Sequence, residues 1–221
     1  MRISVDAKAT VKVGPFSRGG KSRAKVEAAD HDFKPVAIVT PVGILVPTLD
    51  EVFLYSVVSK VTSDCLADCL TQWWEAVRER FGPITTLVIH LDNGPENHSR
   101  RPQVMQRMVD FVRHSQLHVR LAYYPPYHSK YNPIERCWGI RENHWNGALL
   151  DSIETVLASA QTMPWKAMQP VVELVTTTYK TGVKLTKQAM DEVEKHLQRQ
   201  PGLDTWFVDR ACREMMVELH A

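Results

Sequence analysis

Three acidic side chains of this sequence stand where a carboxylate could take part in catalysis. Asp6 lies on an alternating apolar and polar segment, Asp92 directly follows an apolar run, and Glu135 opens a helical pattern. A carboxylate among core strands costs free energy unless it is paired, hydrogen-bonded or bound to a cation. Several converging carboxylates repel one another, and two Mg²⁺ ions, which take oxygen ligands, relieve that repulsion. Two such ions about 3.5–4 Å apart serve in-line displacement at a phosphoryl group, so the three acids predict metal-dependent phosphodiester chemistry.

Each acid also has a purely structural explanation. Glu135 fits the third position of a capping box whose N-cap is Asn132. Asp92 begins the turn sequence DNGPEN, in which Asp and Asn commonly bond their own backbone, and Asp6 alone is uninformative. If Glu135 is only a capping residue, Glu96 is the alternative acid. The three contexts in this order are harder to explain by structure alone, and we therefore favour a functional site.

Basic and aromatic side chains near these acids are candidates for contacts with nucleic acid. A loop rich in glycine has no acid and reads equally well as a solvated surface or a phosphate-contact surface; its basic residues are Lys8, Lys12, Arg18, Lys21, Arg23 and Lys25. The proline-stiffened loop before Glu135 adds Lys130 for a phosphate, Tyr127 for stacking on a base, and His128. His90 could touch a metal-bound water or a phosphate, although a packed, hydrogen-bonded histidine is the simpler interpretation.

The helix that carries Glu135 has an apolar stripe. Ile134, Trp138, Arg141 and Trp145 recur with helical spacing, and we expect them to pack this helix on the sheet. Glu142 lies 7 positions after Glu135, about two helical turns along nearly the same face. A salt bridge is the expected role of Glu142.

The periodicity of apolar residues places the three acids on or beside regular elements. Strands are predicted over residues 2–7, 36–40, 44–49, 52–59, 85–91 and 117–123. Helices are predicted to start near Ser63, Pro102, Asn132 and Ile153, and over residues 187–199 and 205–219. This order suits an α/β protein with a mixed sheet flanked by helices. We expect an α/β core over 1–150 and a mainly helical extension, packed on that core, over 151–221.

Length and composition describe an ordinary globular chain. The sequence has 221 residues, of which 44% are hydrophobic, and a net charge of +2 that predicts no strong overall attraction to a polyanion. Four cysteines without CxxC spacing exclude a disulfide scaffold. The longest apolar stretch, 35–49, is interrupted by proline and glycine and is too short to span a membrane. The first residues lack a secretory signal, so we expect a cytoplasmic protein without a membrane partner.

Three segments resemble the acidic motifs of DDE-type insertion-sequence transposases: SVDAKATVKVG, HLDNGPEN and YHSKYNPIERCWGIRENHWNG. The sequence is similar to the Rhodopirellula-type DDE transposase family, a relative of the mariner-like transposases, and the likeness spans the whole chain. The third motif is the most specific, because NPIE followed by a tryptophan three positions after the glutamate is rare in unrelated folds. The interval of 43 positions from Asp92 to Glu135 favours an insertion-sequence enzyme over a retroviral-type integrase.

The resemblance implies a ribonuclease-H-like fold and metal-dependent cutting and joining of DNA. Carried over to the matching positions, Asp6, Asp92 and Glu135 would be the catalytic, metal-binding triad for two Mg²⁺ ions, with Mn²⁺ as a substitute. The implied partners are transposon ends, target DNA and further copies of the chain in a synaptic complex. The implied location is the bacterial cytosol.

Members of this family carry a helix-turn-helix region ahead of the first acidic motif, whereas five residues precede Asp6 here. We therefore expect either a catalytic domain on its own or a start codon inside a longer reading frame. An alternative function is a non-catalytic remnant that binds DNA or dimerises with a full-length transposase. A third is a standalone nuclease that cleaves DNA without joining strands.

Overall fold

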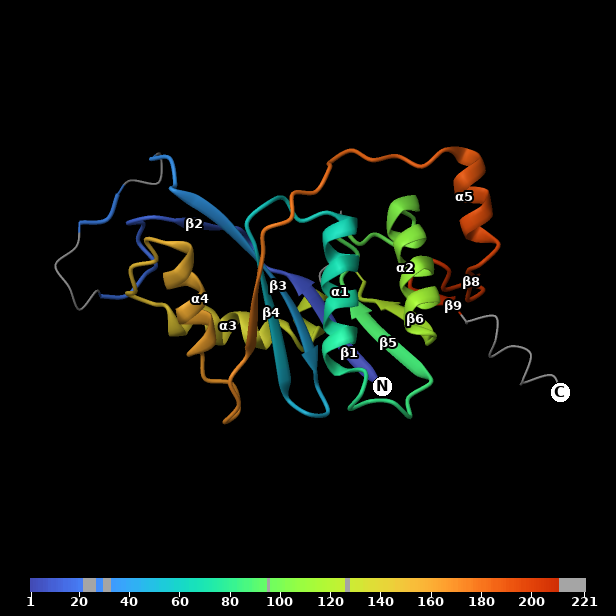
Figure 1. The fold of residues 1–221 in the computed structure, drawn as a ribbon, viewed down its shortest axis with the longest axis horizontal. Coiled ribbons are helices and arrows are strands. Elements are labelled where there is room, and N and C mark those ends of the chain that lie inside the picture. The colour runs from blue at the N-terminus through green and yellow to red at the C-terminus, as the bar shows by residue number, and fades with distance from the viewer. Residues whose placement is uncertain (22–26, 30–32, 95, 126–127, 211–221) are drawn as a thin grey trace. The chain divides into compact units, whose positions relative to one another are not determined.

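A computed structural model describes residues 1–21, 27–29, 33–94, 96–125 and 128–210 of the chain. The chain divides into two compact units, whose helices and strands are drawn in Figure 1. The first unit consists of Met1–Val5, Val61–Asn132 and the described residues from Tyr179 onward, and the second of Asp6–Lys60 and Pro133–Thr178. Each unit joins segments that are distant in the sequence. The expected division at residue 150 follows sequence order instead and stays a prediction.

The strands of the first unit run in mixed directions. Strands β1 (Arg2–Ala7), β5 (Thr86–Leu91) and β6 (His118–Tyr123) are parallel, with Ile3 opposite Ile89 and Ile89 opposite Leu121. On the far side of β6, β9 (Phe207–Arg210) is antiparallel and in turn pairs with β8 (Gln198–Arg199). Because parallel neighbours need a crossover connection, a helix must lie between β5 and β6 in the chain. That order brings the residues after β5 and β6 to the carboxyl edge of the sheet.

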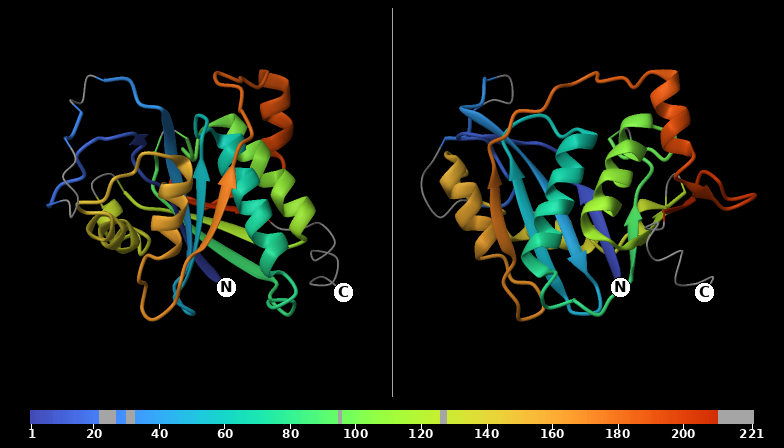
Figure 2. Two further views of the ribbon diagram at one scale, coloured as in Figure 1. Left: turned by 60° about the vertical axis from the view of Figure 1, so that its left-hand side comes forward. Right: turned by 45° about the vertical axis from the view of Figure 1, so that its right-hand side comes forward.

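Three helices pack in the first unit: α1 (Ser63–Val77), α2 (Pro102–Ser115) and α5 (Lys187–Glu194). The Thr62 side chain accepts a hydrogen bond from the Cys65 amide at 3.3 Å and so caps α1. Both α1 and α2 bury an apolar stripe that includes Leu70 and Phe111. The two helices lie side by side, and α5 lies against α2 (Figures 1 and 2).

The strands of the second unit also run in mixed directions. Strand β3 (Ala37–Val46) pairs antiparallel with β2 (Val11–Val13) and with β4 (Glu51–Val57), and β7 (Val171–Val175) is parallel to β4. The helices of this unit are α3 (Glu135–His144) and α4 (Ile153–Gln161). Trp138 of α3, Leu54 of β4 and Trp165 belong to one buried apolar cluster, which holds α3 in place.

The predicted mixed α/β class, with a mixed sheet flanked by helices, is confirmed. Two details of the second unit differ from expectation. The strands predicted over 36–40 and 44–49 are one strand, in which Pro41 is in register with Ser56. Proline lacks a backbone N–H but is tolerated in a strand where no ladder donor is required. Part of the basic segment expected to be a loop forms β2.

The C-terminal segment is less helical than expected. It contains α4 and α5, but also β7, β8 and β9. The helix predicted over 187–199 ends at Glu194, and residues 207–210 of the helix predicted over 205–219 form a strand, while 211–219 lie outside the described residues. Pairing with β4 and β6, which are distant in the sequence, overrides the local helical pattern. Across the described ranges, no helix is both long and apolar enough to cross a membrane.

Candidate active site

Asp6, the acid of the first motif, is half-buried near the end of β1. The indole Nε1 of Trp138 donates a hydrogen bond of 2.7 Å to Asp6 Oδ2. Trp138 itself is 1% exposed, so its ring has little freedom to turn away. A buried donor of this kind stabilises the ionised carboxylate and fixes its orientation.

Glu135, the acid of the third motif, does not sit in the predicted capping box. Helix α3 begins at Glu135, its N-cap is Ile134, and no side-chain bond caps it. The expected N-cap, Asn132, is 1% exposed and bonds elsewhere: its Nδ2 donates to the Val5 carbonyl at 3.3 Å, and its Oδ1 accepts from the Ser4 hydroxyl. The capping-box explanation of Glu135 is therefore wrong, because the middle of β1 competes for the asparagine side chain.

Packing brings the turn of α3 that carries Glu135 to Asp6. Residues three apart on a helix share a face, and Trp138 stands three positions after Glu135 while its indole contacts Asp6. The close approach of this helix to β3 depends on Gly43, where an added Cβ would lie 2.7 Å from Trp138 Cη2. The helix that carries the third acid thus also supplies, three positions later, the side chain that binds the first acid.

Asp92, the acid of the second motif, follows β5 and is half-buried. Asn97 Nδ2 donates to Asp92 Oδ1 at 2.8 Å, and the Ser99 amide donates to Asn93 Oδ1 at 3.0 Å. The turn chemistry proposed as the structural alternative is thus present. It also holds the Asp92 carboxylate through one oxygen and leaves Oδ2 without a hydrogen bond among the described residues.

His90 precedes this loop on β5. Its ring lies 5.7 Å from that of Tyr124. Burial lowers the pKa of His90, and the positive charge of Arg2 lowers it further. A neutral, packed imidazole agrees with the structural interpretation of this residue.

The three acids come from both units, Asp6 and Glu135 from the second and Asp92 from the first. Within the part of the chain that the structure describes, no group of three or more His, Cys, Asp or Glu side chains is arranged as around a metal ion. The joint binding of metal by Asp6, Asp92 and Glu135 stays a prediction.

The basic residues predicted to contact DNA have varied surroundings. Lys8 forms an ion pair with Glu142, with Nζ 2.8 Å from Oε1, which confirms the salt bridge expected for Glu142. The Lys12 ammonium lies 5.6 Å from the centre of the Phe16 ring, and Arg18 Nη2 donates to the Lys12 carbonyl. Arg18 also lines a cavity of about 160 Å³ together with residues 15–17, 19–20, 28 and 147–149.

The remaining candidates for DNA contact also differ in their surroundings. Lys21 is exposed, and the Lys130 ammonium lies 5.2 Å from the centre of the Tyr131 ring, on which the His128 ring also stacks. Arg23, Lys25 and Tyr127 lie outside the described residues. Contact of any of these side chains with DNA stays a prediction.

Sequence reasoning placed the apolar stripe of α3 correctly but missed the polar roles within it. Ile134, Trp138, Arg141 and Trp145 are all buried as predicted. The hydrogen bond from Trp138 to Asp6 was not foreseen, and neither was the isolation of Arg141. Among the described residues, no hydrogen-bond partner of its Nε, Nη1 or Nη2 is present, and its guanidinium stacks 4.8 Å from the Trp145 ring centre. The position of Arg141, a charged residue inside an apolar stripe, was the sequence signal that could have predicted a buried charge.

Comparison with known proteins bears on the family. The comparison with curated proteins found no match. Among solved structures, the Mos1 transposase paired-end complex with left transposon end is similar, with 14% sequence identity and a TM-score of 0.49. The match covers 70% of this chain and 45% of that chain, so this chain spans less than half the length of that protein. The family model of the Rhodopirellula transposase DDE domain matches residues 1–211. The chain therefore belongs to the Rhodopirellula transposase DDE domain family, as its acidic motifs predicted.

Proposed function

We propose that this chain is the catalytic domain of a transposase that cuts DNA and joins strands in a divalent-metal-dependent reaction. The observation that carries the proposal is the family match, which extends over residues 1–211 and includes all three acidic motifs. The cut is a hydrolysis in which a water oxygen bonds to phosphorus and the 3′ oxygen leaves as a hydroxyl. In the joining step that 3′-hydroxyl attacks a phosphodiester of the target and releases a new 3′-hydroxyl there.

Asp6, Asp92 and Glu135 are the proposed catalytic, metal-binding residues. Their donor atoms are carboxylate oxygens, which suit Mg²⁺ or Mn²⁺ better than the softer metals that thiolates select. Bound there, a pair of divalent ions would activate the attacking oxygen and stabilise the leaving oxygen. The contacts of two acids support this assignment: Trp138 orients Asp6, and Asn97 orients Asp92.

The DNA would be the transposon ends and the target, held at its phosphates by basic side chains. Lys8, Lys12, Arg18, Lys21 and Lys130 are the candidates that the structure describes. Lys8 would have to leave Glu142 to bind a phosphate. Because each phosphate contact releases counterions, binding should weaken as salt increases. We further propose that two ends are synapsed by a homo-oligomer in the cytosol.

Nicking of supercoiled plasmid in Mg²⁺ or Mn²⁺ tests the proposal. We expect Asp92→Asn to reduce the nicking rate by at least about 100-fold, which corresponds to about 2.7 kcal/mol in the barrier. Loss of one carboxylate charge weakens the hold on the ions without changing the size of the side chain. The matched control is Asp191→Asn, which makes the same change at an exposed position of α5 and should leave the rate within about twofold, since surface substitutions usually have small effects.

Metal-dependent nicking by Asp92→Asn at the wild-type rate would contradict the assignment. Nicking without any joining of a 3′-hydroxyl oligonucleotide would instead identify a standalone nuclease. A wild-type chain that binds plasmid but never nicks it would identify the non-catalytic alternative.

A further inference from the structure

We propose that Arg199, in the C-terminal segment of the first unit, is a positioning residue that holds the loop after β5 so that Asp92 stays in its working orientation. The inference rests on the proposed function of Asp92. It assigns a role to β8 and to the turn that follows it, neither of which contains a residue of the acidic motifs.

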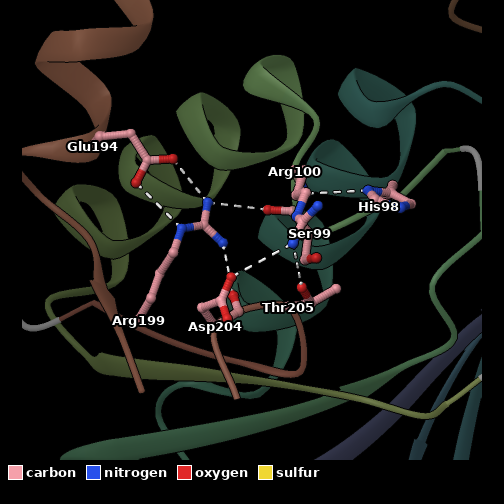
Figure 3. Close-up of polar contacts among 7 residues, drawn as sticks. All are labelled: His98, Ser99, Arg100, Glu194, Arg199, Asp204 and Thr205. Atoms are coloured by element: carbon pink, nitrogen blue, oxygen red, sulfur yellow. Dashed lines mark hydrogen bonds and ion pairs between the residues drawn. The ribbon is translucent and has the colours of Figure 1, made fainter. Parts of the chain in front are cut away.

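All three nitrogens of the Arg199 guanidinium donate hydrogen bonds (Figure 3). Nη2 donates to the Ser99 carbonyl at 3.1 Å and to Glu194 Oε1 at 2.8 Å, and Nε donates to Glu194 Oε2 at 3.3 Å. Nη1 donates to the Asp204 carbonyl at 3.1 Å. The planar fork of arginine suits this arrangement, because its donors point in fixed directions. Arg199 therefore ties α5, the turn before β9 and the loop after β5 to one another.

Ser99 passes this restraint to the acidic motif. Its carbonyl accepts from Arg199, while its amide donates to Asn93 Oδ1 at 3.0 Å. Asn93 directly follows Asp92, and Asn97 Nδ2 donates to Asp92 Oδ1 at 2.8 Å. The path from the guanidinium to the carboxylate thus runs through one buried residue, since Ser99 is 0% exposed.

A second arginine fastens the same loop to the same turn. Arg100 Nη2 donates to Thr205 Oγ1 at 3.0 Å and lies 3.6 Å from Asp204 Oδ2. Its backbone amide donates to His98 Nδ1 at 3.1 Å (Figure 3). These groups are exposed, and exposed ion pairs contribute little. The partly buried fork of Arg199 is therefore the stronger of the two restraints.

Three buried polar atoms in and beside the loop are unsatisfied by any described residue. In the described part of the chain, no hydrogen-bond partner is found for Tyr123 Oη, Ser99 Oγ or Asn97 Oδ1, all of which are buried. Burial raises the pKa of Tyr123; the charge of Arg199 lowers it and that of Asp92 raises it. The Tyr123 phenol, Arg199 and Asp92 therefore lie within electrostatic reach of one another. With these atoms unsatisfied, the loop depends on the bonds that it does make.

Strand β8, which carries Arg199, is itself held in place. Strand β9 pairs with β6, with Val208 opposite Leu121, and Arg199 is opposite Val208 in the β8–β9 pair. The Trp206 carbonyl accepts from the Tyr123 amide at 2.9 Å. The C-terminal segment thus presents Arg199 from the edge of the sheet whose β5 delivers Asp92. Loss of the fork should free the loop without unpairing β6 from β9.

Three variants separate this role from a general structural one. Arg199→Gln removes the charge and most of the fork, and Arg199→Lys retains the charge but cannot bond Ser99 and Glu194 with a fork. The matched control is Arg120→Gln, which breaks a bidentate pair with Asp209 at 2.7 and 2.9 Å, also between β6 and the C-terminal segment but away from the loop. Far-UV circular dichroism checks that each variant is folded.

Hydrogen exchange of the metal-free chain is the first measurement. We expect Arg199→Gln to raise deuterium uptake of the peptide that spans residues 93–101, Arg199→Lys to raise it less, and Arg120→Gln to leave it unchanged. Plasmid nicking in Mn²⁺ is the second. We expect Arg199→Gln to lower kcat by about 10-fold, the lower end of the effect of removing support behind a metal ligand, with the KM for plasmid within twofold.

Unchanged uptake over residues 93–101 in Arg199→Gln would overturn the inference whatever the enzyme does. Raised uptake in Arg199→Gln together with wild-type kcat would also overturn it, provided that Asp92→Asn is inactive. Arg199 would then hold the loop, but Asp92 would not need that restraint for activity. An equal rise in Arg120→Gln would point to general loosening and also overturn it. Full activity of Asp92→Asn would instead refute the proposed function, and the exchange data would still report whether Arg199 holds the loop.

Discussion

At the scale of single residues, the side chains next to the acids do more than fill space. Trp138 packs in the core and orients Asp6 with its indole N–H. Arg141, on the next turn of α3, is 2% exposed and stacks on Trp145. Burial lowers the pKa of Arg141 to about 10, so it is still charged at neutral pH. A buried charge without a partner costs free energy of folding.

We predict that Arg141→Met stabilises the protein. Methionine fills a similar volume and removes the buried charge, which should raise the free energy of unfolding by about 1–4 kcal/mol. Since about 1 kcal/mol corresponds to about 2–4 °C in Tm for a chain of this size, calorimetry or circular dichroism melting measures the change directly. Arg136→Met, at an exposed position of the same helix, should shift Tm little. A lower Tm for Arg141→Met than for the wild type would contradict the prediction.

At the scale of elements, the approach of α3 to β3 decides where Trp138 points. Gly43, opposite Leu54 in the β3–β4 ladder, lies directly beneath the Trp138 ring. A Cβ at Gly43 would lie 2.7 and 2.8 Å from two ring carbons of Trp138 and 3.0 Å from Ile134 Cδ1. Real Cβ atoms do not come so close, so the helix would have to shift.

We predict that Gly43→Ala destabilises the chain by about 1–3 kcal/mol, the usual cost of overpacking a core. It should also slow plasmid nicking, because a displaced Trp138 loses its bond to Asp6. Urea denaturation gives the first quantity. Gly139→Ala is the control on α3, since an added Cβ there meets nothing within 4 Å and alanine favours a helix. Equal stability of Gly43→Ala and the wild type would show that the helix has more room than these distances allow.

At the scale of the whole molecule, the proposed triad draws Asp6 and Glu135 from one unit and Asp92 from the other. Any ligand that binds all three carboxylates therefore binds residues that are far apart in the sequence. A ligand that binds only the native state stabilises it in proportion to its occupancy. Metal binding should therefore appear as an increase in thermal stability.

We predict that Mg²⁺ at about 100 times its Kd raises the unfolding free energy by about 2.7 kcal/mol, or Tm by about 5–10 °C. Asp6→Asn and Asp92→Asn should each abolish most of this shift, which differential scanning fluorimetry with Mg²⁺ or Mn²⁺ can follow. Asp191→Asn, at an exposed position of α5, should keep the full shift. If Asp92→Asn and the wild type respond equally to the metal, Asp92 is not a ligand.

Local signals predicted much of the chain. The starts of α1, α2 and α4 and the alternating strand β1 were foreseen and are present. Each depends on residues a few positions apart, which is the range over which propensity and capping act. The acidic motifs also identified the family, because their residue types and order are specific.

Tertiary structure decided what local signals could not. Asn132 looked like a helix cap and instead bonds to Ser4 and Val5, and the segment around β9 looked helical but pairs with β6. Trp138 reaches Asp6 across 132 positions, and Arg199 reaches Ser99 across 100. The sequence by itself thus determined the candidate acids, the family and the local elements. Which distant donor holds each acidic motif was decided only by the tertiary structure, because a hydrogen bond between remote residues depends on which strands pair and which helices pack.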